Sequence, residues 1–275
     1  GQLSLAIQVF KGEYHRKFML QLISSQLDMD RMDYLKRDSF YSGVAEGNVN
    51  SERLIQMMNV VDDVLVIEEK GIYSVEKFLM SRRLMYWQAY LHKTSLVAEL
   101  ILTKVLKRAK ELTLKGVQLP CSESLLFFMQ NRITLDDFDF DTLDLFSQLD
   151  DFDIISALKS WQRQDDFILS SLSKMIINRD LPKIKVVEDK SLLDDMAPLQ
   201  ERLVAEHNIP LADTNYFIFK GKIKNQAYSK EAEPIRILKK DRTIEDVVEA
   251  SDQLNLKSLS KLVTKYYICF PKQLA

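Results

Sequence analysis

The chain has 275 residues, which is enough for one large domain or two ordinary ones with a buried core. Hydrophobic residues make up 46% and charged residues 28%, a balance that excludes a largely disordered chain. Seven glycines and six prolines leave little room for a many-stranded sandwich or barrel, so we expect helix to dominate. The net charge of -2 excludes a global field that would attract nucleic acid or an anionic membrane.

The cysteines and apolar segments give no sign of a secreted or membrane protein. Cys121 and Cys269 lie far apart and match no metal-ligand spacing, so we expect reduced thiols. No apolar run reaches the length of a membrane span, and no signal-peptide pattern is present. We therefore expect a cytoplasmic protein with neither a membrane nor a specific nucleic-acid partner. The chain starts at Gly1 and runs at once into a helix-like segment, which we interpret as a truncation.

The first sixty residues predict four helices, because their apolar residues recur at three- and four-residue spacing. Ser25 and Asp28 have the spacing of a capping box at the start of the third helix. Loops that contain glycine separate the first helix from the second, at Gly12, and the third from the fourth, at Gly43 and Gly47. The four expected ranges are 2–10, 14–23, 25–40 and 51–60.

Residues 64–73 predict a small hairpin with Gly71 in its turn. From Ser74, the expected N-cap, an uninterrupted helical pattern runs to about Leu114. This is the longest helix that we expect, and it would cross a whole domain.

The segment 135–146 interleaves aspartates with aromatic and leucine residues. We interpret it as helix caps and turns, because Asp is a favoured N-cap. Calcium binding is the sharper alternative, but the glycine and terminal glutamate of an EF-hand loop are missing. Helices are expected on both sides of this segment, over 122–131, 154–161 and 167–178.

After Leu181 the helical periodicity gives way to alternation of apolar and polar residues. The expected strands are 183–187, 216–219, 235–238 and 266–270, and the expected helices are 192–206 and 244–250. We therefore predict a mainly helical domain over 1–181, followed by a small α+β domain over 182–275.

The densest group of polar residues lies in the third expected helix, where they take the spacing of one helix face. Its members, on successive turns, are Asp30, Asp33, Tyr34, Arg37 and Asp38. Carboxylates, a phenol and a guanidinium on one face can hold a metal, bind phosphate or bond to a sugar hydroxyl. The alternative, which spacing alone favours, is a solvated face of Asp–Arg pairs.

A second polar face is expected on the long helix, with members every three or four residues. They are Arg82, Tyr86, Tyr90 and Lys93. Two bases alternating with two phenols suit a ligand with anionic and ring parts, and they also suit a helix interface between subunits. Spacing leaves both open. The neighbouring His92 is, by base rate, more often a packed or exposed residue than a ligand.

The segment Asp28–Asp38 resembles the D-x-D-x-x-D-Y-x-x-R-D motif of HD-superfamily phosphohydrolases of the dNTP triphosphohydrolase kind. The segment Ala89–Lys93 is similar to the A-Y-Q-H-K sequence on that family's long helix. The resemblance implies an HD-domain-type helical bundle. It also implies metal-assisted attack of water on a (deoxy)nucleoside triphosphate, which gives a nucleoside and triphosphate.

The resemblance further implies roles for individual residues. Asp30 would ligate a divalent metal ion, whose identity among Mn, Mg, Fe, Ni and Zn stays open. Phosphate would be bound by Arg31, Tyr34 and Arg82. The sugar would meet Asp38 and Tyr90, and Leu91 would lie near the base and sugar. These residues form one expected site on two helices.

Two departures from the family keep the substrate open. Arg31 stands where the family usually has Lys, and Leu91 replaces a family Gln. His92 and Lys93 match positions that in some members belong to a regulatory nucleotide site between subunits. The resemblance thus implies a homo-oligomer, a dimer or a tetramer.

None of the three histidines is followed by Asp, so the chain has no His-Asp doublet, and we assign no catalytic residue. We expect a fragment that lacks the HD doublet segment, is inactive by itself and binds the metal weakly or not at all. One alternative is a nucleotide-binding, oligomerisation or regulatory module without turnover. Another is an HD hydrolase that acts on a different phosphorylated substrate.

Overall fold

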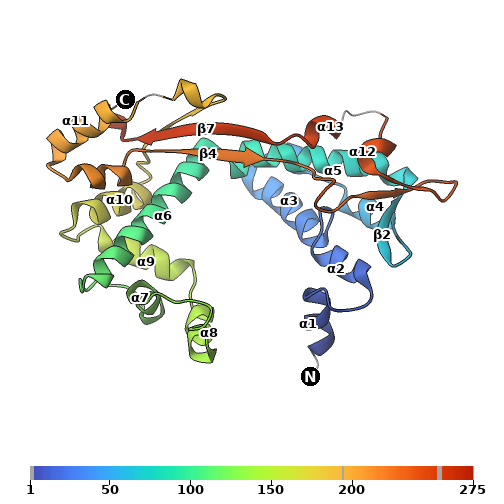
Figure 1. The fold of residues 1–275 in the computed structure, drawn as a ribbon, viewed down its shortest axis with the longest axis horizontal. Helices are drawn as coiled ribbons and strands as arrows, with labels where there is room; N and C mark the ends of the chain where they lie inside the picture. The colour runs from blue at the N-terminus through green and yellow to red at the C-terminus, as the bar shows by residue number, and fades with distance from the viewer. Residues whose placement is uncertain (1–2, 194, 253–255, 275) are drawn as a thin grey trace. The chain divides into compact units, whose positions relative to one another are not determined.

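The computed structural model describes residues 3–193, 195–252 and 256–274 (Figure 1). Helices dominate, with two small sheets, so the expected fold class, mainly α with a small α+β region, is confirmed. No helix within these ranges is long and apolar enough to span a bilayer.

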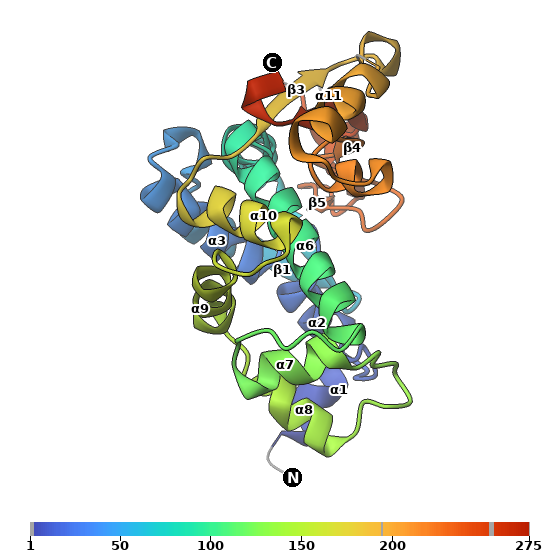
Figure 2. The ribbon, with the colours of Figure 1, turned by 90° about the vertical axis from the view of Figure 1, so that its left-hand side faces the viewer.

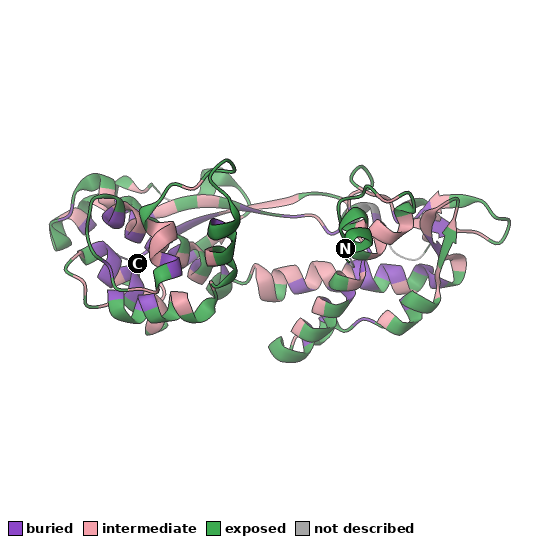
Figure 3. Ribbon diagram, turned by 90° about the horizontal axis from the view of Figure 1, so that it is seen from below, coloured by how far each residue is buried: buried purple, intermediate pink, exposed green. Residues whose placement is uncertain are grey.

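The chain forms two compact units, each built from separate stretches of sequence. The first comprises residues 1–92 and 223–264, and the second comprises 93–222 and 265–275. Each unit has its own buried core (Figure 3). The division therefore differs from the expected boundary near residue 181, which lies inside the second unit.

Before residue 86 the described part of the first unit contains the helices α1 to α5, with α5 following the first two strands of its sheet. They are α1 (Ser4–Phe10), α2 (Lys17–Ile23), α3 (Met29–Ser42), α4 (Ser51–Gln56) and α5 (Ile72–Met85). The expected start of the third helix at Ser25 is wrong. Asp28 is the N-cap of α3, since its side chain accepts from the Arg31 N–H, and the Ser25 N–H donates to Asp28 Oδ2 at 3.0 Å. The helix ends at Gly43, whose φ of 73° is left-handed.

The hairpin lies earlier in the chain than expected. Strand β1 (Met58–Val61) pairs antiparallel with β2 (Val64–Glu68) through a turn at Asp62 and Asp63. Both aspartates have positive φ, 48° and 63°, as a two-residue type I′ turn requires. The expected helix over 51–60 is confirmed only as far as Gln56, because β1 follows it. The expected hairpin over 64–73 is wrong, because β2 is the second strand of the hairpin and not the first.

The long helix is interrupted. After α5 the chain forms a π-helical turn, η3 (Tyr86–Tyr90), and α6 (Lys93–Leu114) starts only beyond Leu91 and His92. The Leu91 N–H donates to the Tyr86 carbonyl at 2.6 Å, the five-residue bond of a π turn. The expectation of one uninterrupted helix is wrong, and α6 belongs to the second unit.

A four-stranded sheet in order β1-β2-β5-β6 completes the first unit. Its other strands are β5 (Arg236–Leu238) and β6 (Ile244–Asp246), followed by α12 (Val247–Ala250) and α13 (Leu256–Leu259). The helix expected from residue 244 thus begins as a strand. Residues of α3 and α5 share one core with residues of the later segment, namely Ala227, Tyr228, Ile235, Ile237, Val247, Leu256 and Leu259.

The second unit gathers helices around α6 and contains most of a three-stranded sheet (Figure 2). Its further helices are α7 (Glu123–Gln130), α8 (Phe140–Ser147), α9 (Asp151–Trp161), α10 (Phe167–Ile177) and α11 (Ala197–His207). The sheet order β3-β7-β4 joins Lys183–Val187, Val263–Phe270 and Phe219–Asn225. The strand expected over 216–219 is wrong, because a 3-10 helix runs to Tyr216 and β4 starts at Phe219.

Candidate functional site

In the first unit the polar face of α3 meets the polar face of α5 and η3. The Tyr90 hydroxyl donates to Asp38 Oδ2 at 2.6 Å. The ring of Tyr34 lies edge-on to that of Tyr90, with centroids 6.2 Å apart. These contacts bring together residues that are more than fifty positions apart in sequence.

Arg82 extends this site along α5. Its Nη1 donates to the Ala227 carbonyl at 3.1 Å, and its guanidinium lies 5.9 Å from the Tyr86 ring centroid. The Tyr86 ring is in turn edge-on to Tyr90 at 5.2 Å. Arg82 Nε is buried and has no hydrogen-bond partner among the residues that the structure describes. The guanidinium is therefore held from one side, with donor capacity left over.

Arg31 is held at the first turn of α3. Its Nε donates to the Ser25 carbonyl at 2.7 Å and to Asp28 Oδ2 at 3.1 Å. Asp28 is only 3% exposed, so its carboxylate is a fixed partner. Because both contacts use Nε, they constrain the direction of the Arg31 guanidinium.

Two phenols of the site, those of Tyr34 and Tyr90, are kept protonated at neutral pH. Burial raises the pKa of Tyr34, and nearby Tyr86 adds to the increase, whereas Arg82 and Arg31 oppose it. Burial also raises the pKa of Tyr90, followed by its hydrogen bond to Asp38. The Tyr34 hydroxyl can therefore donate a hydrogen bond to an oxygen of a ligand, whereas the Tyr90 hydroxyl already donates to Asp38.

The structure places the residues expected for this site as follows. Those brought together in one cluster are Arg31, Tyr34, Asp38, Arg82 and Tyr90. Asp30 lies exposed in the first turn of α3, and Leu91 is half-buried beyond the π turn. His92 and Lys93 are exposed, and Lys93 begins α6 in the second unit.

Two members of the α3 face are not part of the cluster. Arg37 Nη2 pairs with Asp33 Oδ2 at 2.7 Å, and their side chains are 57% and 64% exposed. This pair matches the alternative of a solvated Asp–Arg face. The α3 face thus divides into a solvated half and a half that meets α5.

Sequence reasoning missed part of the site. Tyr86 stood on the second polar face but received no role, although its ring lies between Arg82 and Tyr90. The backbone carbonyls of Ser25 and Ala227, which hold the two arginines, left no signal in the pattern of side chains. The helical spacing of Tyr86 was the one available signal.

The metal ion that the resemblance implies would need several ligands from the described side chains. Within the described ranges, no three His, Cys, Asp or Glu side chains cluster in a way that could hold a metal. Asp30 offers one exposed carboxylate, whereas metal sites take several ligands. These residues by themselves therefore do not fit a metal centre.

Comparison with known proteins places the chain in a family. Residues 49–120 match the family model described as the HD associated region. The crystal structure of a phosphohydrolase from Bacteroides thetaiotaomicron has a TM-score of 0.92 and 49% identity, covering 99% of this chain and 68% of that one. The chain belongs to this phosphohydrolase family. The expected relation to HD phosphohydrolases is confirmed at this level, and the dNTP substrate stays a prediction.

Two further proteins are similar in sequence to this chain. The uncharacterized protein YwfO of Bacillus subtilis is 39% identical over 175 residues, which are 63% of this chain. The deoxynucleoside triphosphate triphosphohydrolase SAMHD1 homolog of Dictyostelium discoideum is 26% identical over 112 residues, 40% of this chain. The chain spans 39% of the length of the first relative and 22% of the second.

Proposed function

We propose that the chain forms the triphosphate- and sugar-binding part of an HD-type phosphohydrolase that acts on (deoxy)nucleoside triphosphates. The observation that carries this proposal is the meeting of the two polar faces. Arg31 and Tyr34 of α3 lie in one cluster with Arg82 of α5, and Tyr90 of η3 bonds to Asp38. The name of the Bacteroides relative supports hydrolysis, and the name of the Dictyostelium relative supports a dNTP substrate.

The chemistry of the cluster suits a polyphosphate. Guanidinium groups such as those of Arg31 and Arg82 bind phosphate oxygens with several hydrogen bonds in a planar geometry. The protonated Tyr34 adds a neutral donor. Phosphoryl transfer depends mainly on such positioning and charge stabilisation. The Asp38–Tyr90 pair would accept a sugar hydroxyl at one end of the ligand.

The proposal extends to the reaction and the assembly. The products would be a nucleoside and triphosphate, and Asp30 would supply a single carboxylate to a divalent metal ion. No step of hydrolysis is assigned to the described residues, since they do not complete that metal site. Exposed His92 and Lys93 would belong to a regulatory nucleotide site in a homo-oligomer. Because Leu91 stands where the family has Gln, an HD hydrolase of another phosphorylated substrate stays an alternative.

The test is release of triphosphate from each dNTP by the full-length protein with Mn²⁺. Arg82→Ala should lower kcat/KM by roughly a hundredfold or more, because it removes a fixed charge at the phosphate. Arg83→Ala is the matched control, since Arg83 is adjacent and bonds to the Ser258 carbonyl outside the cluster. Asp30→Ala should abolish turnover.

The outcomes separate the alternatives. Wild-type turnover in Asp30→Ala would show that Asp30 is not a ligand. Binding of dNTPs without turnover in the full-length protein would favour a nucleotide-binding or regulatory module. Equal losses in Arg82→Ala and Arg83→Ala would remove the specific role of Arg82 in phosphate binding.

A further inference from the structure

The loop between β4 and β5, residues 226–235, contacts the candidate site, because its Ala227 carbonyl accepts from Arg82. Ser229 lies 203 positions after Gln26, yet both belong to the first unit and are joined by hydrogen bonds. Within this segment Tyr228 is 1% exposed, its hydroxyl accepts from the Ile235 N–H at 3.1 Å, and it donates to Asp246. The loop between β4 and β5 is therefore closed on a buried anchor.

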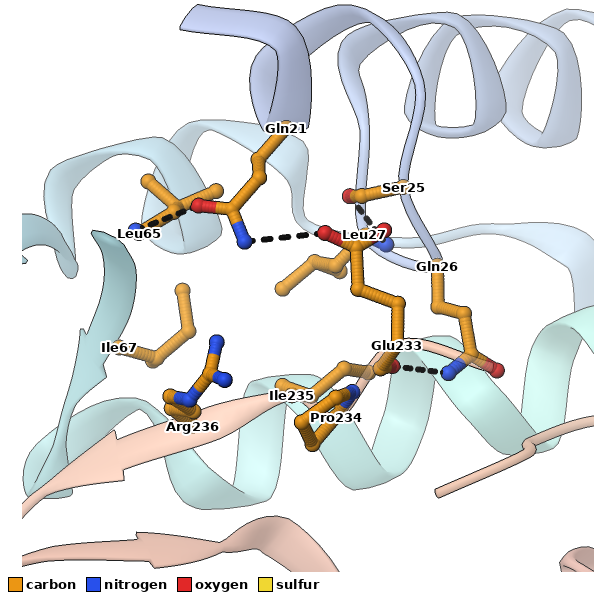
Figure 4. A pocket seen from close by; sticks show the side chains of 10 residues that line it. All are labelled: Gln21, Ser25, Gln26, Leu27, Leu65, Ile67, Glu233, Pro234, Ile235 and Arg236. Atoms are coloured by element: carbon orange, nitrogen blue, oxygen red, sulfur yellow. Dashed lines mark hydrogen bonds between the residues drawn. The ribbon is translucent and has the colours of Figure 1, made fainter. Parts of the chain in front are cut away.

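The side-chain amide of Gln26 clamps this loop (Figure 4). Its Oε1 accepts from the Ser229 N–H at 2.8 Å, and its Nε2 donates to the Ser229 carbonyl at 2.6 Å. The same Nε2 also donates to the Glu233 carbonyl. Both amide hydrogens and one lone pair are thus used on backbone groups, in the way that a neighbouring strand would use its own backbone.

The clamp lies next to both carbonyls that hold the arginines. Ser25, whose carbonyl accepts from Arg31 Nε at 2.7 Å, directly precedes Gln26. Ala227, whose carbonyl accepts from Arg82 Nη1 at 3.1 Å, lies two residues before Ser229. One side chain therefore connects the backbone that orients the first guanidinium to the backbone that orients the second.

We propose that Gln26 is a positioning residue that fixes Arg31 and Arg82 relative to each other for a polyphosphate ligand. The inference rests on the proposed function for the ligand, and on the contacts alone for the positioning. Preorganised charges bind more strongly, because less freedom is lost on binding. The adjoining cavity, lined by Gln26, Glu233 and Arg236 among others, has a volume of about 20 Å³, room for a single water.

Gln21 provides a matched control in the same pocket (Figure 4). Its Nε2 donates to Glu233 Oε1 at 2.9 Å, and its Oε1 accepts from the Leu65 N–H at 2.8 Å. Gln21 thus ties the loop by a side chain and does not touch the backbone near Ala227. Its removal should lower stability without moving either guanidinium.

The direct test is the Arg82 Nε–H signal in ¹H–¹⁵N spectra of the whole chain, since this buried group should exchange slowly. Gln26→Ala should shift the signal and speed its hydrogen exchange, whereas Gln21→Ala should leave it in place. Gln26→Met keeps the length of the side chain but loses its amide, so it should change the Arg82 signal in the same way. It takes the place of Gln26→Ala in the test if the alanine variant folds poorly. An unchanged Arg82 signal in the Gln26 variants would overturn the proposal.

Calorimetric titration with inorganic tripolyphosphate measures the effect on binding. Gln26→Ala should weaken binding roughly tenfold, and Gln26→Ala with Arg82→Ala should bind no more than about twofold weaker than Arg82→Ala alone. Losses that simply add would overturn the coupling of Gln26 to Arg82. If the wild-type chain does not bind tripolyphosphate, the proposal of a polyphosphate ligand is wrong. The Arg82 signal still decides whether Gln26 positions the guanidinium.

Discussion

Burial separates side chains of α3 that share one helical face. Asp33 and Arg37 form an ion pair in solvent, a kind of pair that contributes about 0 to 1 kcal/mol. Tyr34 and Asp38, which directly follow Asp33 and Arg37 in the chain, are half-buried against Tyr90. Spacing placed all four on one face but could not divide them, because the division depends on where another helix packs.

Double-mutant cycles should distinguish these two pairs. The coupling between Asp38 and Tyr90, from Asp38→Ala, Tyr90→Phe and the double variant, should be roughly 1 to 2 kcal/mol, since the bond is short and half-buried. The matched cycle on Asp33 and Arg37 should give less than about 0.5 kcal/mol. Urea unfolding measures both. Equal couplings would contradict the distinction drawn from burial.

At the scale of elements, aspartates start many of the helices. Asp139, which lies in the Asp-rich segment 135–146, caps α8 as that segment predicts, and Asp150 beyond the segment caps α9 in a capping box with Asp153. The sequence could show this, because an N-cap contacts the backbone only two or three residues ahead. Asp166 caps α10 in the same way but also pairs with Arg108 of α6, 58 positions away. That second role required the tertiary structure.

The Asp166–Arg108 pair should make stability depend on pH in the acid range. Burial opposes ionisation of Asp166, but hydrogen bonds from Arg108 and from the Leu169 N–H outweigh it and lower the pKa of Asp166 below 3.8. The ionised form thus stabilises the fold above about pH 4, and this contribution is lost as the pH falls through the lowered pKa. The free energy of unfolding should therefore fall below pH 4.

Variants of Asp166 isolate this contribution. Asp166→Asn keeps an oxygen for the cap but loses the charge, so it should cost roughly 2 kcal/mol at pH 7 and show a weaker fall below pH 4. Asp166→Ala should cost about 1 kcal/mol more, because the cap is also lost. Urea unfolding at pH 7 and pH 3 measures both. A wild-type pH profile in Asp166→Asn would contradict the role of the pair.

The interruption between α5 and α6 shows why element boundaries were missed. Apolar spacing continues past Tyr90, so the pattern reads as one helix. The π turn at Tyr86–Tyr90 brings Tyr86 and Tyr90 ring to ring and carries Tyr90 to Asp38. Such turns are frequent at functional sites. This turn is joined to α3 by the bond between Tyr90 and Asp38, which are 52 positions apart. A local pattern of residues therefore could not place the break.

At the scale of the whole molecule, each unit is built from two distant stretches. Ile237, from the last sixth of the chain, is fully buried in the core formed with α3 and α5. β2 pairs in parallel with β5, so Ile67 lies opposite Ile237. Residues near the start of the chain therefore need later residues in order to complete their core.

Hydrogen exchange should reveal this dependence. Ile237→Ala should destabilise the first unit by roughly 2 to 5 kcal/mol and lower the protection of α3 and α5, with α10 unchanged. Leu172→Ala is the matched control, because Leu172 is fully buried in α10. It should lower the protection of α10 instead. Equal loss of protection in both units for either variant would show that the two units unfold together.

The sequence by itself determined the helical fold class, most helix positions after residue 120, and the two polar faces, since these depend on local periodicity and on caps. Only the tertiary structure decided that the faces meet through Tyr90 and Asp38, and that Arg31 and Arg82 are held by backbone carbonyls next to the Gln26 clamp. The physical reason is range. Helix periodicity acts over a few residues, whereas the hydrogen bonds of Gln26 join groups 203 positions apart, and such pairings form only when the whole core packs.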